Sequence, residues 1–259
     1  MRPEAGEVRV DIRGPVATIV FDRPAARNAM TWAMYDALDA ALEQMAGMDD
    51  LRVLVLRGMG SHFVAGTDIS QFVDFTTGAD GLAYEKRLEA TVARLDTLKV
   101  ATIAGVQGYA VGGGLALAAA CDLRLCTPDA QFGVPIARTV GNCLSMANYA
   151  RLVAHFGVSR TMQMLLTAEF MTAAEALALG FVLPLADPRA FDSRLTALCT
   201  RLAGHAPITV QVTREAIRRI VARFDAEGDD LVTRAYASDD FREGVRAFVE
   251  KRAPMWKGE

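Results

Sequence analysis

The stretch VATIAGVQGYAVGGGLALAAACD, from Val100 to Asp122, is an apolar run that breaks at glycines and continues as an alanine-rich helical pattern. Gly112 to Gly114 stand where a short buried strand gives way to a helix. The first N–H groups of a helix have no intrahelical partner, and glycine lets a ligand approach them. The turn is therefore a candidate site for negative charge, although tight packing of strand against helix also favours glycine.

A second strand also ends in a loop of small residues. The continuous apolar run from Val53 to Leu56 is typical of a parallel strand covered on both faces. In the loop that follows, Asp68 is placed to cap a short helix near Ile69, and His62 is interpreted as a surface histidine. Two strand-to-loop junctions with free N–H groups are what an oxyanion hole requires.

The rest of the pattern indicates an α/β fold. Two β-branched runs, Val8 to Ile12 and Val16 to Phe21, flank a Gly-Pro turn signal and predict a hairpin. Later strands alternate with helical patterns, which predicts parallel strands joined by crossovers, with the sheet complete by about residue 135. We divide the chain into a core, residues 1–189, and a helical C-terminal region, residues 190–259.

Composition argues against several classes of function. The 28 basic and 31 acidic residues include no basic block, so we expect no nucleic-acid partner. Four cysteines without a CxxC pair and three histidines without ligand spacing predict no metal site and no disulfide framework. No uncharged apolar run reaches the roughly 18 residues of a membrane span. We therefore expect a cytoplasmic protein with no membrane partner.

Several short motifs, in this order, resemble those of the crotonase family, also called the enoyl-CoA hydratase/isomerase family. They are Arg23-Pro24 with Arg27-Asn28-Ala29-Met30, then Phe63 to Asp68, Gly108 to Gly114, Cys121-Asp122, Phe241 to Gly244 and Ala247 to Arg252. The resemblance implies a ββα spiral core with a C-terminal helical trimerisation region. It also implies an acyl-CoA substrate processed through an enolate, a homotrimer or hexamer, and no tightly bound cofactor beyond the coenzyme A of the substrate.

The resemblance also implies roles for individual residues. The backbone N–H groups of Ala65 and Gly113 would form the oxyanion hole that polarises the thioester carbonyl. Arg27, which by itself reads as a solvated charge, would contact the CoA phosphates, and Lys251 would reach the nucleotide. The remaining residues expected at the CoA-binding segments are Ala29, Gly66, Thr67 and Asp68.

The chain departs from the family pattern where hydratases carry two glutamates that position and activate water. Those positions are occupied by Ala116 and Ile136, and neither side chain transfers a proton. The resemblance therefore supports the substrate class more strongly than it supports hydration.

The segment from Ala137 to Met146 offers other polar side chains. Asn142 is a candidate to orient water or substrate, but a helix N-cap before Leu144 is the simpler interpretation. Cys143 would act as a nucleophile only with a lowered pKa. Further candidates are Arg138 and Ser145, and Asp74 and Tyr84, both of which we expect on a solvated face.

Three hypotheses follow. The first is a hydratase or isomerase by descent, with proton transfer moved to another side chain. The second is other enolate chemistry on a CoA thioester, such as decarboxylation, thioester hydrolysis or retro-aldol cleavage. The third is a non-catalytic acyl-CoA-binding protein.

Overall fold

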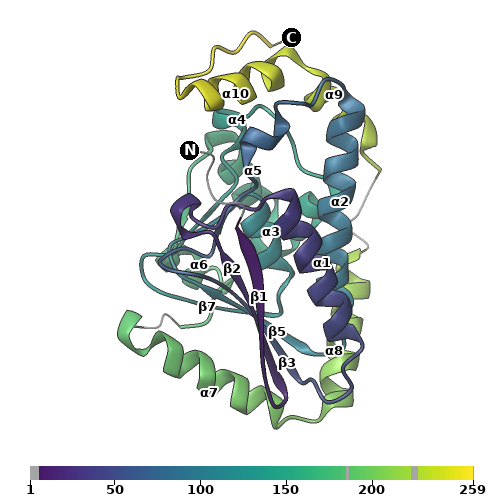
Figure 1. The fold of residues 1–259 in the computed structure, drawn as a ribbon, viewed down its shortest axis with the longest axis vertical. Coiled ribbons are helices and arrows are strands. Elements are labelled where there is room, and N and C mark those ends of the chain that lie inside the picture. The colour runs from purple at the N-terminus through teal and green to yellow at the C-terminus, as the bar shows by residue number, and fades with distance from the viewer. Residues whose placement is uncertain (1–5, 185–186, 223–226, 259) are drawn as a thin grey trace.

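The computed structural model describes residues 6–184, 187–222 and 227–258, which form two sheets surrounded by helices (Figure 1). In the larger sheet the strand order is β1-β2-β3-β5-β7. The predicted hairpin of β1 and β2 is confirmed as its antiparallel pair, and the other strands run parallel. The strands are β1 (Glu7–Arg13), β2 (Val16–Asp22), β3 (Val53–Gly58), β5 (Ala101–Val106) and β7 (Leu123–Cys126).

The smaller sheet has the order β4-β6-β8-β9. Its strands are β4 (Val64–Ala65), β6 (Tyr109–Val111), β8 (Gln131–Gly133) and β9 (Met171–Thr172). The last strand pairs antiparallel with β8 through Phe132 and Met171. The expectation that the sheet is complete by about residue 135 is therefore wrong, because two residues were too short a strand to recognise.

The chain winds through both sheets in repeats of two strands and a helix. Each repeat places one strand in the larger sheet and one in the smaller sheet before its helix. The repeats are β3-β4-α2, β5-β6-α3 and β7-β8-α4, with α2 at Gly78–Thr97, α3 at Gly113–Ala120 and α4 at Ile136–Thr139. This is the ββα spiral that the resemblance implied.

The smaller sheet brings the two glycine-containing loops together. Strands β4 and β6 are parallel, with Val64 opposite Ala110 and Ala65 opposite Val111. Because both strands end at the same edge, the residues that follow Ala65 lie beside the residues that follow Val111. The predicted meeting of these two junctions is confirmed by this pairing.

Helix α1 (Trp32–Ala46) covers one face of the larger sheet. Thr31, a residue type that is favoured at the N-cap, precedes the helix, and its hydroxyl accepts the Met34 N–H. Met34, Leu38 and Leu42 are buried at helical spacing against the sheet, which places the main core between the sheet and α1, α2 and α3.

The remaining helices follow the smaller sheet and complete the C-terminal part. They are α5 (Met146–Thr167), α6 (Ala173–Ala178), α7 (Phe191–Ala203), α8 (Pro207–Val221), α9 (Asp229–Ala237) and α10 (Asp239–Glu250), with short 3-10 turns η1 (Pro24–Ala26), η2 (Ile69–Phe72) and η3 (Pro188–Ala190). Phe191 and Leu195 of α7 pack with Val53 and Val55 on the other face of the larger sheet. The C-terminal helices thus contribute to the core as well as to the periphery.

Helices α9 and α10 fold back over one end of α2 (Figure 1). The approach of α9 is close: a Cβ built on Gly81 of α2 would lie 1.9 Å from the Tyr236 ring. Glycine at residue 81 therefore permits the contact that brings Tyr236 into the interior.

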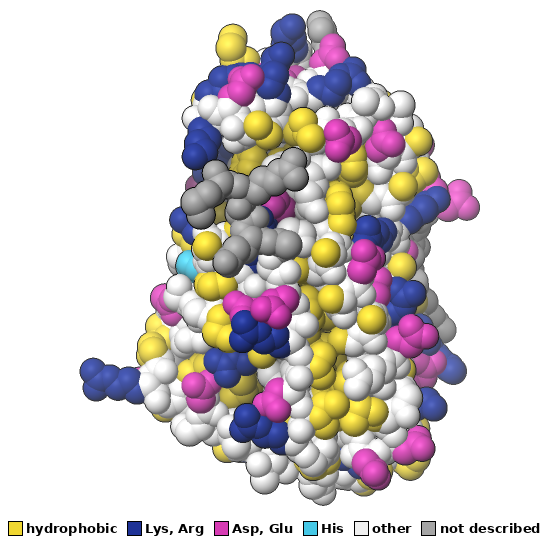
Figure 2. All heavy atoms as spheres, in the orientation of Figure 1, with side chains coloured by type: hydrophobic (Ala, Val, Ile, Leu, Met, Phe, Trp, Pro, Cys, Tyr) yellow, Lys and Arg dark blue, Asp and Glu magenta, His cyan; other side chains and the backbone are white. Residues whose placement is uncertain are grey.

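Helices long and apolar enough to cross a membrane do not occur among the described residues. Figure 2 shows basic and acidic side chains interspersed over the face in view, without a continuous field of either sign.

Candidate active site

The N-terminus of α3 presents a backbone amide without an intrahelical partner. Gly113 is the first residue of α3, and the first bond of the helix runs from the Ala116 N–H to the Gly112 carbonyl (3.1 Å). The next glycine serves packing, because a Cβ on Gly114 would lie 2.0 Å from the Val64 carbonyl oxygen. Both explanations for the glycine run therefore apply, each to a different glycine.

The loop after β4 turns a second amide toward α3. Thr67 forms a parallel bridge with Met30, in which the Met30 N–H donates to the Gly66 carbonyl (2.8 Å) and the Asp68 N–H donates to the Met30 carbonyl (2.9 Å). In such a bridge the N–H of Thr67 itself points away from Met30. Strand β6 and α3 lie on that other side, and a Cβ on Gly113 would be 3.6 Å from the Thr67 hydroxyl.

The predicted oxyanion role of Ala65 is corrected by its hydrogen bond. The Ala65 N–H donates to the Arg27 carbonyl at 3.0 Å, on the side away from α3. This amide holds the loop and is not available to a ligand. The amide that lies on the side of Gly113 belongs to Thr67, two residues later.

A chain of buried hydroxyls lies beside these amides. The Thr67 hydroxyl is 2.8 Å from the hydroxyl of Tyr35 and 2.8 Å from that of Tyr84. Burial raises the pKa of Tyr35 to about 12 and that of Tyr84 well above its usual value, so both phenols stay protonated at neutral pH. The three hydroxyl groups of Tyr35, Thr67 and Tyr84 thus form one buried hydrogen-bonded cluster.

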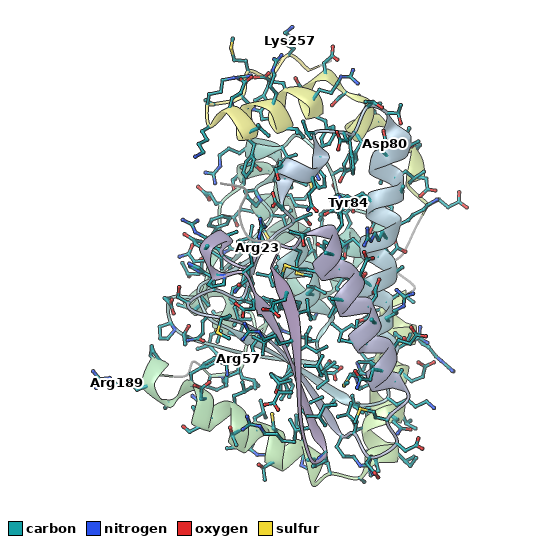
Figure 3. The ribbon with its side chains drawn as sticks, in the orientation of Figure 1. Arg23, Arg57, Asp80, Tyr84, Arg189 and Lys257 are labelled. Carbon is teal, nitrogen blue, oxygen red and sulfur yellow. The ribbon has the colours of Figure 1, made fainter. Side chains whose placement is uncertain are left out.

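Tyr84 thus lies on the inner side of α2, and the expectation of a solvated face is wrong (Figure 3). Asp74, by contrast, is exposed as expected. The difference arises because α2 begins at Gly78, so that Tyr84 falls on the stripe of the helix that faces the core.

Buried polar groups hold the loops around the site. Arg23 pairs with Asp68 (Nη2 to Oδ2, 2.8 Å) and donates to the Ala29 carbonyl (3.1 Å). The Asn28 amide donates to the His62 carbonyl at 2.7 Å and accepts the Arg23 N–H at 2.8 Å. Arg23 and Asn28 are both buried, so these bonds tie residues 23–30 to the loop after β3.

Asp68 caps η2 as predicted. Its Oδ1 accepts the Ser70 N–H at 3.1 Å, while its other oxygen faces Arg23. Burial raises the pKa of Asp68, but hydrogen bonds from Ser70 and Arg23 outweigh burial and lower the pKa below its usual value. Both carboxylate oxygens are therefore engaged in holding the loop.

Arg27 is exposed at the rim of this region. Its guanidinium lies 5.3 Å from the centre of the Tyr109 ring. His62 is half-buried rather than fully on the surface, and its Nδ1 accepts the Tyr109 N–H at 3.3 Å. Burial and the nearby Arg27 lower the pKa of His62. Lys251 is exposed at the C-terminal end of α10.

Ala116 and Ile136 lie in different places in and beside the main core. Ala116 lies in the wall of a cavity of about 10 Å³, together with Gly112, Val134 and Leu144. Ile136, at the start of α4, is half-buried against the main core. The polar side chains at the cavity are those of Asn148 and Arg151, and the Nδ2 of Asn148 is buried without a partner among the described residues.

Side chains in the segment before α5 do not take the roles that the sequence predicts for them. The N-cap of α5 is Ser145, whose hydroxyl accepts the Asn148 N–H, so the prediction that Asn142 caps this helix is wrong. Asn142 instead donates through Nδ2 to the Tyr236 hydroxyl (2.9 Å). Burial raises the pKa of Cys143 to about 12, which disfavours a thiolate nucleophile, and Arg138 is exposed on α4.

The structure adds a buried carboxyl group that the sequence reasoning missed. Glu85 is 2% exposed; its Oε1 accepts the Tyr236 hydroxyl at 2.6 Å and its Oε2 accepts the Ser145 N–H at 2.9 Å. Burial raises the pKa of Glu85 to about 7, against hydrogen bonds that lower it. The signal was present, since Glu85 falls on the helical stripe with Gly81, Tyr84, Leu88 and Val92.

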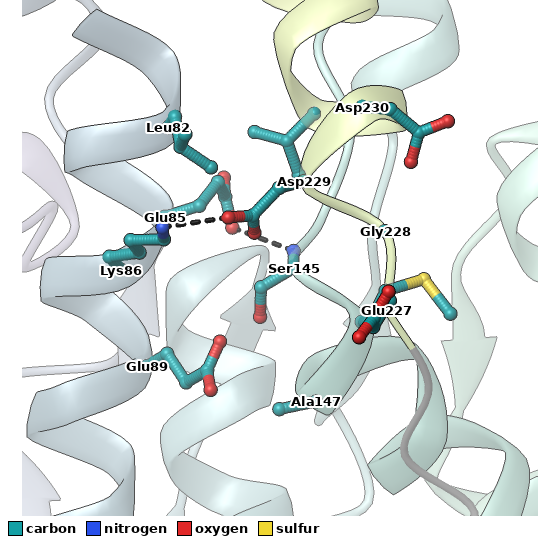
Figure 4. Close-up of a pocket in the computed structure, with 12 residues that line it drawn as sticks. Leu82, Glu85, Lys86, Glu89, Ser145, Ala147, Glu227, Gly228, Asp229 and Asp230 are labelled. Carbon is teal, nitrogen blue, oxygen red and sulfur yellow. Dashed lines mark hydrogen bonds and ion pairs between the residues drawn. The ribbon is translucent and has the colours of Figure 1, made fainter. Parts of the chain in front are cut away.

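Glu85 lies in the wall of a pocket of about 610 Å³ between α2, the start of α5 and α9 (Figure 4). The same wall carries Lys86, which pairs with Asp229 at 2.7 Å. Among the described residues, His, Cys, Asp and Glu side chains do not gather in a group that could hold a metal ion. Two amides and a hydroxyl chain thus lie at the start of α3, and one buried carboxyl group lies in the wall of this second pocket.

Comparison with known families gives the class of protein. The family model described as enoyl-CoA hydratase/isomerase matches residues 11–259. The chain therefore belongs to the enoyl-CoA hydratase/isomerase family, as the motifs predicted.

Individual relatives are similar over nearly their whole length. A probable enoyl-CoA hydratase of Mycobacterium bovis is 32% identical over 247 residues, which cover 93% of this chain and 94% of the relative. The 2,3-dehydroadipyl-CoA hydratase of Escherichia coli is 32% identical over 269 aligned residues, covering 97% and 99%.

Solved structures share the fold. An enoyl-CoA hydratase/carnitine racemase structure from Magnetospirillum magneticum has a TM-score of 0.79 at 28% identity, covering 97% of this chain and 96% of that one. A methylmalonyl-CoA decarboxylase bound to 2-nitronate-propionyl-CoA has a TM-score of 0.88 at 24% identity, covering 97% and 98%.

Proposed function

We propose that the protein acts on acyl-CoA thioesters and stabilises the thioester enolate between the N–H groups of Thr67 and Gly113. The observation that carries this proposal is the pair of amides on adjoining loops, one at a helix N-terminus and one turned away from Met30. Both would donate to the oxygen that gains charge when the enolate forms. Each such donor typically contributes about 3 kcal/mol to transition-state stabilisation.

The coenzyme A portion is proposed to bind along the loop that contains Arg27 and Ala29, near Gly66, with Lys251 approaching the nucleotide. Support comes from the exposed Arg27 guanidinium, which is free of a carboxylate partner among the described ion pairs. We expect Arg27→Ala to weaken coenzyme A binding about tenfold in calorimetry, because a phosphate would lose a charged contact. An unchanged affinity would remove Arg27 from the proposal.

Two reaction classes remain candidates. The names of the sequence relatives favour hydration of an enoyl thioester, and the family description adds isomerisation. The apolar side chains of Ala116 and Ile136 favour the second class, in which the substrate itself supplies much of the driving force, as in decarboxylation. Asn142 enters neither scheme directly, because its Nδ2 is bonded to Tyr236.

A substrate panel tests the proposal. Purified protein would be mixed with crotonyl-CoA, a 3-enoyl-CoA and a malonyl-type CoA, while the thioester ultraviolet band and the products are followed. Turnover of crotonyl-CoA at ordinary hydratase rates would support hydration and would show that side chains at residues 116 and 136 are dispensable. Tight binding of every thioester without reaction would instead favour a binding protein.

A homotrimer, or a hexamer built from two trimers, is the assembly that we propose. Helix α8 leaves four apolar side chains more than half exposed: Ile208, Val212, Ile217 and Ile220. Such a surface usually marks a contact with another protein. Light scattering at micromolar concentration measures the assembly directly, and a monomer there would contradict the proposal.

A further inference from the structure

We propose that Glu85 is the acid–base group of the acyl site, transferring the proton of the acyl α-carbon in place of a glutamate on α3 or α4. This inference rests on the proposed function. It assigns proton transfer to a residue of α2 that is held by α9. The sequence alone had suggested polar side chains in the loop before α5 for this chemistry.

Contacts on two sides link the Glu85 carboxyl group to residues that border the amides of Thr67 and Gly113. On one side, Tyr84 precedes Glu85 and its hydroxyl bonds to Thr67, while its ring lies 6.3 Å from the Tyr236 ring. Tyr236 in turn donates to Glu85. The Glu85 carboxyl group is therefore hydrogen-bonded to Tyr236, and the Tyr236 ring lies beside the ring of Tyr84. The Tyr84 hydroxyl in turn bonds to Thr67.

On the other side, the Ser145 N–H donates to Oε2 of Glu85. The residue before Ser145 is Leu144, which lies with Gly112 and Ala116 in the wall of the small cavity behind the α3 turn. The Glu85 carboxyl group therefore bonds to the residue that follows Leu144, and it also lies in the wall of the larger pocket shown in Figure 4.

The charges around Glu85 favour gain and loss of the Glu85 proton near neutral pH. No cation pairs with Glu85 among the described residues, and the groups that face it are mostly acidic or neutral. They are Tyr35 on α1, Tyr84, Lys86 and Glu89 on α2, Glu227, Asp229, Asp230 and Tyr236 at and before α9, and Cys143 and Tyr149 around the start of α5. Lys86 is engaged by Asp229, so burial dominates and raises the pKa of Glu85 to about 7. A group with this pKa serves equally as acid and base.

The proposed step moves one proton and one electron pair. The bond between the α-carbon and its hydrogen breaks, the proton passes to an ionised Glu85 oxygen, and the electron pair moves onto the thioester oxygen. The N–H groups of Thr67 and Gly113 bind that oxygen. In the reverse step the protonated carboxyl group returns a proton to the same carbon, or to another carbon of the conjugated enolate.

Exchange of the α-hydrogens of butyryl-CoA in D₂O tests this step without knowledge of the natural acyl group. Deuterium incorporation is followed by mass spectrometry, and butyryl-CoA affinity is measured by calorimetry. We expect the wild-type exchange rate to rise with pH through about 7, because the base must be ionised. Glu85→Gln is expected to slow exchange at least about 100-fold, with unchanged affinity.

Gln is a suitable replacement because it has the shape of Glu85 and still accepts the Ser145 N–H. Its amide nitrogen would take the place of Oε1 and donate to the Tyr236 hydroxyl. Glu43→Gln, on the exposed side of α1, is the charge-matched control and should leave exchange unchanged. Circular dichroism checks the fold of each variant.

Tyr236→Phe provides a second readout if Glu85→Gln does not fold. The Tyr236 hydroxyl lowers the pKa of Glu85, so its loss should move the exchange profile to higher pH, an effect that a structural role alone would not produce. Equal exchange by wild type and Glu85→Gln, or a wild-type rate without an ionisation near 7, would overturn the role of Glu85. Failure of wild-type protein to bind butyryl-CoA would overturn the proposed function itself.

Discussion

Helices α2 and α3 occupy corresponding places in successive ββα repeats, yet they contribute to the site in different ways. Every residue of α3 is buried, and with only glycine, alanine and leucine it offers the site a backbone amide. Helix α2 is buried along one stripe, and that stripe carries Tyr84 and Glu85 among apolar residues. Under the proposed function, the interior helix would supply electrostatic stabilisation and the peripheral helix would supply side-chain chemistry.

The physical reason lies in the packing of each helix. Helix α3 runs between the sheets and the surrounding helices, and Gly114 lets it approach the Val64 carbonyl closely. A side chain with charge would have no room and no water there. Helix α2 packs with α9, whose Tyr236 donates to the buried carboxyl group of Glu85.

The largest effect is expected from adding one methyl group to α3. In Gly114→Ala the new Cβ would meet the Val64 carbonyl oxygen at 2.0 Å, a backbone atom that cannot move aside alone. We expect a loss of more than about 4 kcal/mol in the free energy of unfolding, measured by urea denaturation, or failure to fold.

Gly47→Ala, at the end of α1, is the matched control. Its Cβ would lie 3.6 Å from the Gln44 carbonyl oxygen, an ordinary contact, and the free energy of unfolding should change by less than about 0.5 kcal/mol. A well-folded Gly114→Ala protein would show that α3 is not packed as closely as described, and the contrast with α2 would weaken.

The next effect concerns the carboxyl group on α2. The pKa of Glu85 is raised from 4.5 to about 7 in the folded protein, so the folded state binds more protons than the unfolded state between these values. Stability from this group is therefore present below pH 4.5 and is lost as pH rises through about 7. The loss is on the order of 3 kcal/mol.

Urea denaturation of wild type and Glu85→Gln at pH 5 and pH 8 measures this change. The stability of the Gln variant relative to wild type should increase with pH, because Gln does not titrate. A constant difference would mean that Glu85 titrates near its ordinary pKa and that α2 does not bury an acid.

A smaller effect is expected from shortening the hydroxyl chain. Tyr84→Phe removes one partner of the Thr67 hydroxyl and leaves the bond to Tyr35 at 2.8 Å. We expect a loss of about 1 kcal/mol in the free energy of unfolding, since no buried group becomes unpaired. A double-mutant cycle with Tyr35→Phe separates the coupling of the two phenols, and additive losses would contradict a shared chain.

The smallest effect is expected outside α2. Cys143→Ser should leave turnover of any thioester processed in the panel within about twofold, because a thiol of raised pKa is no nucleophile at neutral pH. Loss of activity in this variant would move the side-chain chemistry from α2 to the loop before α5.

Much of the scaffold was predictable because it depends on local patterns. The hairpin followed from two β-branched runs around a Gly-Pro turn, and the caps at Thr31 and Asp68 followed from residue type and position. The glycine run correctly marked the start of α3. Each of these features depends on hydrogen bonds or torsion angles within a few residues of the signal.

The errors concern contacts between distant segments. Ala65 was assigned a free amide, but Arg27, 38 positions earlier, accepts its hydrogen bond. Tyr84 was expected to face solvent, yet it meets Thr67, and Asn142 was expected to cap α5, yet it meets Tyr236. The sequence pattern of one segment does not specify which atoms of another segment will approach it.

The sequence alone determined the repeating strands and helices, the close-packed α3 turn and the family to which the chain belongs. Those properties follow from periodicity, glycine and short motifs, which act locally. The tertiary structure decided that Thr67, and not Ala65, turns its amide toward Gly113, and that Glu85 is buried beside Tyr236. Hydrogen-bond direction and burial depend on the packing partner, and a carboxyl pKa near 7 exists only where folding removes the group from water.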